Sequence, residues 1–293
     1  MNKIAELSPE WQSWLTDNLA RGCTPQSLVE VMASHNFDPM FANAVVFHFS
    51  TLGQAPESAS APNAAQRAAT TGYQYETPRM ANTGNFIETH DRQVRVVSRI
   101  AKPYLVVLDN VLSSEECDEL VSLSANKLKR SKIVDPATGG DAVIADRTSY
   151  GAFFALNETP FIANLDRRLS ELMSWPVENG EGIQILKYAV GGEYKPHFDY
   201  FPPRDQGSKG HLNQGGQRVS TLVMYLTDVL EGGETIFPEL GLAVSPKKGS
   251  AVYFEYCNSH GQVDPLTLHG GNPVVQGEKW IATKWMRERR YGG

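Results

Sequence analysis

The sequence has few cysteines, no long apolar run and no excess of basic residues. Its three cysteines, Cys23, Cys117 and Cys257, lie far apart and form no C-x-x-C pair, which argues against a disulfide framework or a structural zinc site. No apolar stretch approaches the roughly 18 residues of a membrane-spanning helix. Residues 1–14 lack the apolar core of a secretion signal. The sequence therefore predicts a cytoplasmic protein that does not contact a membrane.

The charge balance is mildly acidic, with a net charge of −6 and a pI near 5.7. General nucleic-acid binders are usually basic, so we expect no nucleic-acid partner. A length of 293 residues with 41 % hydrophobic composition is enough for one large domain, or for one domain plus a small second one.

Three regions differ in composition. Residues 1–50 carry proline start signals for three short amphipathic helices, at Ser8-Pro9, Thr24-Pro25 and Asp38-Pro39. They are expected to form a small helical domain, whose role as a structural, dimerising or partner-docking element is open. Residues 51–84 are rich in small and polar residues and are expected to be a linker. Residues 85–293 are expected to be the catalytic domain.

The third region begins with mixed signals and ends as a series of short strands. Ser113 and Glu116 form a capping box that predicts a helix, and a second helix is expected over 160–173. Short strands are expected over 86–87, 94–100, 104–108, 183–188, 219–226, 234–237, 251–256 and 279–287. This order predicts an α+β arrangement around a sandwich or barrel, and jelly-roll barrels bind ligands inside their mouths.

His197 and Asp199 are the first candidate metal ligands. On an extended chain, side chains at i and i+2 point to the same side, so this pair can reach one metal ion. Among the seven histidines, His269 has the most suggestive surroundings, a glycine-rich stretch before an apolar strand pair. Two histidines and one carboxylate on one face form the triad of non-haem iron(II) oxygenases, which leaves coordination positions open. Zinc prefers a closed tetrahedral set or a single open position.

Those open positions suit a bidentate 2-oxo acid together with dioxygen. The far carboxylate of such a co-substrate needs a cation, and Lys279 stands at the head of the strand expected over 279–287. The pattern therefore predicts Fe(II) at the triad, with Lys279 pairing with the co-substrate.

From about Lys102 to Arg290 the chain resembles a prolyl 4-hydroxylase of the 2-oxoglutarate and Fe(II) dioxygenase superfamily. Besides the His-x-Asp, His and Lys series, the resemblance is carried in order by residues 146–149, 153–154, 180–188, 197–201, 216–226, 232–238, 246–251 and 269–285. It implies a double-stranded β-helix (jelly-roll) core with supporting helices.

The family pattern also implies roles for single residues. Tyr188 and Thr235 match positions that bind the co-substrate together with Lys279. Tyr194, Arg218 and Trp285 match positions that contact the substrate in members acting on peptides. After Trp285, the sequence 286–290 departs from the family's usual histidine-containing ending, which puts a collagen-like peptide preference in question.

These residues predict a hydroxylase that uses Fe(II), 2-oxoglutarate and O₂, acts on proline in a peptide or protein, and releases succinate and CO₂. Ascorbate is the expected reductant. A free amino acid or small metabolite is the alternative substrate. A non-catalytic oxygen-sensing module would share the fold, but the complete triad and Lys279 argue against it. A zinc hydrolase or metal-storage protein would need a further ligand or a general base.

The glycine-rich loop 207–216, with His211, is expected to be a mobile lid.

Overall fold

The computed structural model describes residues 7–20, 23–37, 41–42, 45–46, 49, 72–80, 84–131, 133–134, 140–142, 146–202, 205 and 207–291. The chain divides into two compact units, Met1–Asn63 and Ala64–Gly293. The helix expected from residue 38 falls only partly among the described residues, and residues 51–71 of the expected linker fall outside them.

The first unit contains the two predicted helices α1 (Pro9–Ala20) and α2 (Pro25–Ser34). Thr24 caps α2 as its sequence predicts, because its side chain accepts a hydrogen bond from the backbone N–H of Ser27. Leu15 of α1 and Met32 of α2 are both fully buried, and they belong to one small hydrophobic core that is separate from the main core. These two helices therefore have an apolar contact of their own.

Among its described residues, the second unit holds a nine-stranded and a four-stranded antiparallel sheet, two two-stranded sheets and several helices. Its elements begin with β1 (Phe86–Glu88), β2 (Gln93–Ala101), β3 (Tyr104–Asp109), α5 (Ser114–Ala125), β4 (Lys129–Arg130), β5 (Ile133–Val134), β6 (Asp141–Ala142), β7 (Tyr150–Phe154), α6 (Pro160–Met173) and β8 (Ile183–Tyr188). They continue with β9 (Tyr194–His197), α7 (Ser208–Asn213), β10 (Arg218–Tyr225), β11 (Glu231–Gly232), β12 (Thr235–Phe237), β13 (Leu242–Val244), β14 (Ala251–Glu255), β15 (His269–Gly271), β16 (Val274–Gln276) and β17 (Lys279–Arg287). Short 3₁₀ turns occupy Val177–Asn179, Pro238–Leu240 and Pro265–Thr267.

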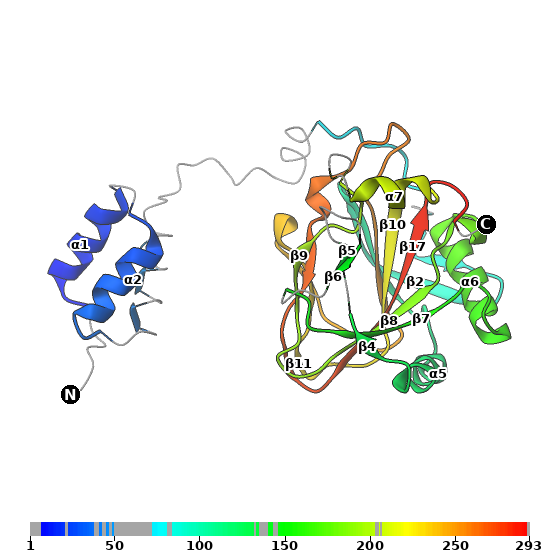
Figure 1. Cartoon of the computed structure of the whole chain (residues 1–293), viewed down its shortest axis with the longest axis horizontal. Coiled ribbons are helices and arrows are strands. Elements are labelled where there is room, and N and C mark those ends of the chain that lie inside the picture. The colour runs from blue at the N-terminus through cyan, green and yellow to red at the C-terminus, as the bar shows by residue number, and fades with distance from the viewer. Residues whose placement is uncertain are drawn as a thin grey trace. The chain divides into compact units, whose positions relative to one another are not determined.

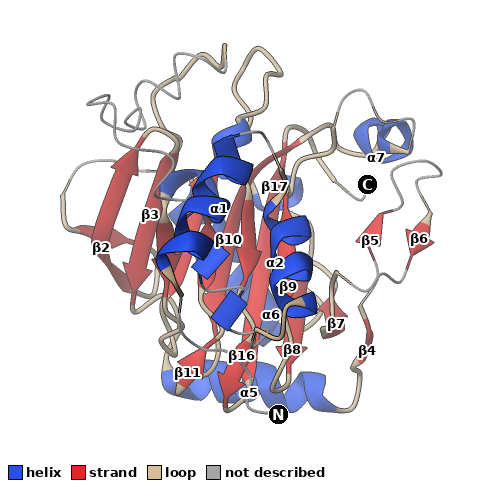
Figure 2. Cartoon of the chain, turned by 90° about the vertical axis from the view of Figure 1, so that its left-hand side faces the viewer, coloured by secondary structure: helices blue, strands red, loops and turns tan. Residues whose placement is uncertain are grey.

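The larger sheet has the strand order β1-β2-β3-β14-β10-β17-β8-β7-β4, and a smaller sheet has the order β13-β12-β15-β9. The two sheets pack face to face, because the Phe237 ring of β12 lies 5.2 Å from the Phe254 ring of β14. Figure 2 shows β2 and β3 side by side at one edge of the larger sheet. The predicted α+β fold with a strand-rich core and supporting helices is confirmed.

Strand β17 connects the core to the site. All of its residues are buried, so both of its faces are covered. On one face Lys279, Thr283 and Trp285 line a cavity. On the other face the Lys284 ammonium pairs with Asp166 of α6 at 2.7 Å. The helix α6 therefore covers the side of the larger sheet that faces away from the cavity.

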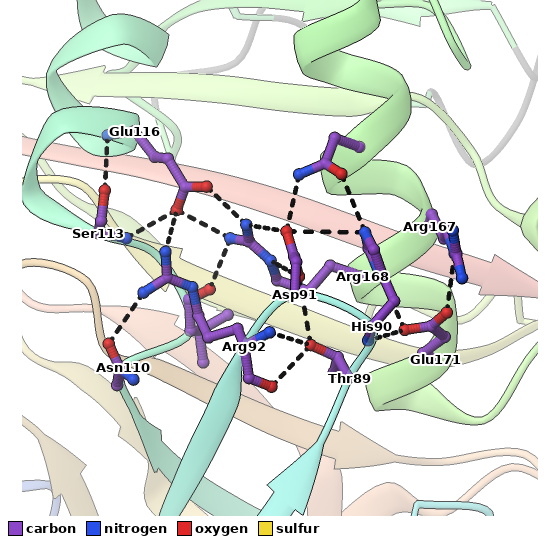
Figure 3. Close-up of polar contacts among 12 residues, drawn as sticks. Thr89, His90, Asp91, Arg92, Asn110, Ser113, Glu116, Arg167, Arg168 and Glu171 are labelled. Carbon is purple, nitrogen blue, oxygen red and sulfur yellow. Dashed lines mark hydrogen bonds and ion pairs between the residues drawn. The ribbon is translucent and has the colours of Figure 1, made fainter.

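A cluster of charged side chains around Arg168 ties α6 to α5 and to the β1–β2 turn (Figure 3). The guanidinium of Arg168 donates to both carboxylate oxygens of Asp91, at 2.9 and 2.6 Å, and to both of Glu116, at 2.8 and 2.6 Å. Glu116 also accepts from the backbone N–H of Ser113, which completes the predicted capping box. Arg168 therefore holds three elements together with paired charge.

The catalytic unit begins before residue 85, where the sequence alone predicts its start. Residues 72–80, expected to be linker, lie against β14 and the loop that follows it. The backbone N–H of Arg79 donates to Glu255 at 2.8 Å, Met80 is fully buried, and Asn258 donates to the Gln74 carbonyl at 2.9 Å. Among the described residues, no helix combines the length and apolar character needed to cross a bilayer.

Candidate metal and co-substrate site

The two candidate histidines face each other across two neighbouring strands. His197 ends β9 and His269 begins β15, and the two are direct register partners in the smaller sheet. Asp199 follows two residues after His197, as the i, i+2 argument requires. One Nε2 or carboxylate atom from each of the three side chains lies within 4.8 Å of the others. This is the arrangement that a single metal ion needs.

Backbone carbonyls set the orientation of both imidazole rings. Nδ1–H of His197 donates to the Lys195 carbonyl at 2.9 Å, and Nδ1–H of His269 donates to the Thr267 carbonyl at 3.0 Å. A carbonyl can only accept, so the neutral form of each ring carries its lone pair on Nε2, the atom that faces Asp199. Burial, and then the neighbouring histidine, lowers the pKa of His197 to about 3, so this ring is neutral at pH 7.

The carboxylate of Asp199 is held in its ionised form. Burial raises the pKa of Asp199, but the interactions of its carboxylate with His269, His197 and Arg218 outweigh burial and hold the pKa below its usual range. The Thr221 hydroxyl donates to Asp199 Oδ2 at 2.7 Å and also contacts the Tyr256 hydroxyl at 2.9 Å. Two imidazoles and one ionised carboxylate on one side form a donor set that fits Fe(II).

Lys279 lies at the start of β17, opposite Tyr188 on β8, and only 4 % of it is exposed. Burial lowers the pKa of Lys279 to about 8, against the opposing effect of Glu234. Within the described residues no carboxylate pairs with its ammonium. A Cβ added at Gly271 would lie 3.4 Å from Lys279 Nζ, so this glycine leaves room beside the ammonium. A buried cation without a protein partner fits a small anionic ligand.

Two hydroxyl side chains lie in the same cavity. Thr235 of β12 accepts a hydrogen bond from the Tyr225 hydroxyl at 2.8 Å, which leaves the Thr235 proton available for a ligand. Tyr188 is buried beneath the Lys279 ammonium, which lies 5.6 Å from the centre of its ring. Burial raises the pKa of Tyr188, so its hydroxyl stays protonated and can donate.

All nine residues singled out in the sequence line one cavity of about 440 Å³. They are His197, Asp199, His269, Lys279, Tyr188, Thr235, Tyr194, Arg218 and Trp285. The structure therefore brings together residues that are spread over 98 positions of the chain, counted as 285 − 188 + 1.

The three predicted substrate contacts line this cavity and are held by neighbouring side chains. The Tyr194 ring stacks on His197 with ring centroids 3.6 Å apart. Arg218 makes a two-pronged ion pair with Glu181, at 2.7 and 2.9 Å, and its guanidinium lies 4.0 Å from the Trp285 ring centre. Arg218 is thus oriented by a carboxylate and by an aromatic face.

Several residues of the site have no role in the sequence-based prediction. Arg147 and Gln184 line the cavity and share a hydrogen bond of 3.1 Å, and Glu181 fixes Arg218. The Thr221 hydroxyl and the Thr267 carbonyl orient two of the candidate metal ligands, Asp199 and His269. For Glu181, the sequence offers one signal of a role in the site, which is a charged residue just ahead of the apolar strand β8.

The expected mobile lid contains a helix. Residues 208–213 form α7, and the strand end that follows Trp285 contacts it. Figure 1 shows α7 at the end of the barrel where β17 ends. The loop prediction was therefore wrong for these six residues.

Comparisons with known proteins agree with this geometry. Residues 183–287, from β8 to the end of β17, match the model of the 2OG-Fe(II) oxygenase superfamily. The chain is 38 % identical over 253 residues to prolyl 4-hydroxylase 5 of Arabidopsis thaliana, covering 79 % of this chain and 84 % of that protein. It is 42 % identical over 202 residues to prolyl 4-hydroxylase 1 of the same plant, covering 64 % and 70 %.

A solved structure is also similar. It is the 2OG complex of a viral collagen prolyl hydroxylase from Paramecium bursaria Chlorella virus-1, which is 29 % identical in sequence. The match has a TM-score of 0.50 and covers 62 % of this chain and 95 % of the viral chain. It agrees with the jelly-roll core described above.

Proposed function

Because this chain belongs to the prolyl 4-hydroxylase family of 2-oxoglutarate- and Fe(II)-dependent oxygenases, we propose that it hydroxylates proline in a peptide or protein. The observation that carries the proposal is the meeting, in one cavity, of a His–Asp–His set and a buried lysine that pairs with no carboxylate of the described residues. Relatives named as prolyl hydroxylases favour proline in a polypeptide over a free amino acid or small metabolite.

Nε2 of His197, Nε2 of His269 and the carboxylate of Asp199 would hold the iron. Fe(II) with 2-oxoglutarate and O₂ supplies the oxidant for a C–H bond, one oxygen atom entering the product alcohol and the other the succinate that forms with CO₂. Each ligand is oriented by a hydrogen bond from or to a neighbouring group, so the set is prearranged for binding.

Lys279 would hold the far carboxylate of 2-oxoglutarate. Pairing with an anion favours the charged form of the amine, so binding would raise the pKa of Lys279 from about 8. The hydroxyls of Thr235 and Tyr188 would donate to the same carboxylate. The buried side chains around Lys279, Thr235 and Tyr188 would limit the access of water to this end of the cavity.

Tyr194, Arg218 and Trp285 would position the target ring. Tyr194 already stacks on an iron-ligand candidate, so a ring that packs against it would lie close to the metal. Trp285 offers an indole N–H that has no hydrogen-bond partner within the described chain, and a substrate carbonyl could accept from it.

The test is succinate formation from 2-oxoglutarate under air, with Fe(II), with a panel of proline-containing peptides and with the same peptides carrying alanine instead of proline. We propose ascorbate as the reductant, so each reaction is run with and without it. Succinate that rises only with a proline peptide, together with a peptide heavier by one oxygen atom, supports the proposal. Iron binding without any succinate would instead favour a sensing module.

We further propose that residues 1–50 dock a partner or a second copy of the chain. Because residues 72–80 pack into the catalytic unit, a truncation that tests this must end by residue 63. An unchanged KM for the peptide in the truncated protein would count against docking of the substrate. An unchanged number of subunits per particle, measured by analytical ultracentrifugation, would count against association with a second copy.

A further inference from the structure

Arg287, the last residue of β17, is a buried cation whose hydrogen bonds lead away from the metal. Only 1 % of the residue is exposed. Its Nη1 donates to Glu181 at 3.2 Å, and its Nη2 donates to the backbone carbonyls of His211 and Gln214. One guanidinium therefore joins the wall of the cavity to the last turn of α7 and to the residue that follows this helix.

The helix α7 depends on such outside support. It has six residues and no side-chain cap at Gly207, and a helix this short is not stable alone. The chain leaves it through Gly215 and Gly216, both with positive φ, and a Cβ at Gly216 would lie 2.3 Å from the Glu288 carboxylate. Glu288 in turn accepts from the backbone N–H of Gln217 at 2.8 Å. The segment after β17 thus holds the segment around α7 in place.

The start of α7 is part of the cavity wall. Ser208 lines the cavity together with Phe201 and Pro202. The Phe201 ring stacks on the His211 ring with centroids 5.1 Å apart, and the Arg287 guanidinium lies 4.8 Å from the Phe201 ring centre. A movement of Arg287 would therefore be transmitted to this wall.

The same guanidinium also affects the substrate side of the cavity. Arg287 and Arg218 are register partners on β17 and β10, and like charges in that position repel. Glu181 lies between them and accepts from both, and Arg218 packs on Trp285. Lysine could not replace Arg287 here, because a single ammonium cannot span two carbonyls and a carboxylate as the planar fork does.

We propose that Arg287 is a positioning residue that fixes α7 as a preformed wall of the peptide-binding cavity and so determines how tightly the peptide binds. This inference rests on the proposed peptide hydroxylase function. Arg287 does not contact the metal ligands or Lys279, so it acts through α7, Phe201 and Glu181.

The test compares Arg287→Lys and Arg287→Gln with Arg289→Gln in the full-length protein. Arg289 is exposed and contacts the same segment through one weaker bond, 3.3 Å to the Leu212 carbonyl, so it is a matched control. We expect faster amide hydrogen exchange over 208–216 in both Arg287 variants. We also expect KM for the peptide to rise about 10- to 100-fold with peptide-independent succinate formation unchanged. Arg289→Gln should leave each quantity near the wild-type value.

The two Arg287 variants keep the inference falsifiable if one is unstable. Arg287→Lys retains a cation beside Glu181 and should fold, and melting curves check this for both. Unchanged exchange over 208–216 in a folded Arg287→Lys protein overturns the inference, as does a raised exchange with an unchanged KM. If the wild type hydroxylates no peptide, the proposed function fails, while the exchange experiment still decides whether Arg287 holds α7.

Discussion

The cluster around Arg168 and the cavity around Lys279 are both built of buried charge, and they differ in how that charge is paired. Arg168 meets four carboxylate oxygens from Asp91 and Glu116 (Figure 3), and its hydrogen bonds lower the pKa of Asp91. Lys279 is as buried but has no carboxylate partner among the described residues. The paired cluster lies on the outer side of the larger sheet, and the unpaired charge lies in the cavity.

This difference separates a structural from a functional use of charge. Removing one member of a paired buried cluster leaves another charge without a partner, so the fold loses stability. An unpaired cation already destabilises the empty protein, so it is retained only if a ligand supplies the missing anion. The comparison predicts that changes in the cavity affect ligands and turnover, and that changes around Arg168 affect stability.

The largest expected effect is on turnover. His197→Ala should reduce succinate formation to below about 0.1 % of wild type, because the metal loses one of three ligands. The free energy of unfolding should change little. His260→Ala, which alters an exposed histidine beside Glu76, is the control and should keep full activity. An active His197→Ala protein would disprove the metal assignment.

The largest expected effect on stability is at Arg168. Arg168→Met should lower the free energy of unfolding in urea by about 3–5 kcal/mol, because Asp91 and Glu116 lose their shared cation. The neighbouring Arg167 side chain is 62 % exposed and pairs with Glu171, so Arg167→Met should cost less than about 0.5 kcal/mol. Equal losses of stability in the two variants would show that the buried pairing of Arg168 stabilises the fold no more than the exposed ion pair of Arg167 does.

A moderate effect on metal binding is expected from the hydrogen bond between Thr221 and Asp199 in the cavity. Thr221→Val removes the hydrogen bond to Asp199 and should weaken Mn(II) binding about 10- to 100-fold in an anaerobic titration. Ser220→Ala, on the opposite face of β10, is the control and should bind Mn(II) as the wild type does. If both variants bind alike, Thr221 does not orient the ligand.

The smallest expected effect is a pH dependence of stability. Nε2 of His90 lies 2.9 Å from the Asn164 amide oxygen and Nδ1 lies 3.0 Å from Glu171, so both donate in the charged ring and the pKa of His90 is raised. Because the pKa of His90 is higher in the folded protein, the charged ring stabilises the fold fully at pH values below its unfolded pKa, near 6.5. This stabilisation is lost as the pH rises through the folded pKa. The Tm of wild type should exceed that of His90→Gln by about 1–2 °C at pH 5.5. A gap that widens above pH 7.5 would contradict this sign.

Local signals predicted much of the fold. The capping box at Ser113 predicts α5, and the proline at position 160 begins a helix that ends at Met173 as expected. The sequence did not predict α7, because six residues without a cap or an apolar face owe their shape to Arg287, 76 positions away from His211. Residues 72–80 have linker composition, and they are held by contacts with distant parts of the chain, such as the hydrogen bonds of Arg79 to Glu255 and of Asn258 to Gln74.

The residues of the site likewise divide into those that local sequence signals predict and those whose roles depend on distant contacts. His197 and Asp199 lie only two positions apart in the sequence, so this pair could be recognised as candidate ligands without a structure. Glu181 could not, because its importance comes from lying between two arginines that reach it from different strands. Residues whose role is set by distant partners become evident only in three dimensions.

The central claim is that the unpaired charge of Lys279 is reserved for the far carboxylate of the co-substrate. The most direct measurement is anaerobic binding of 2-oxoglutarate and of pyruvate, which shares the chelating end but lacks that carboxylate, to the Fe(II)-loaded wild type and Lys279→Met proteins. We predict that the wild type prefers 2-oxoglutarate by about 100-fold and that Lys279→Met loses this preference without losing pyruvate binding. A Lys279→Met protein that still prefers 2-oxoglutarate as strongly would contradict the account.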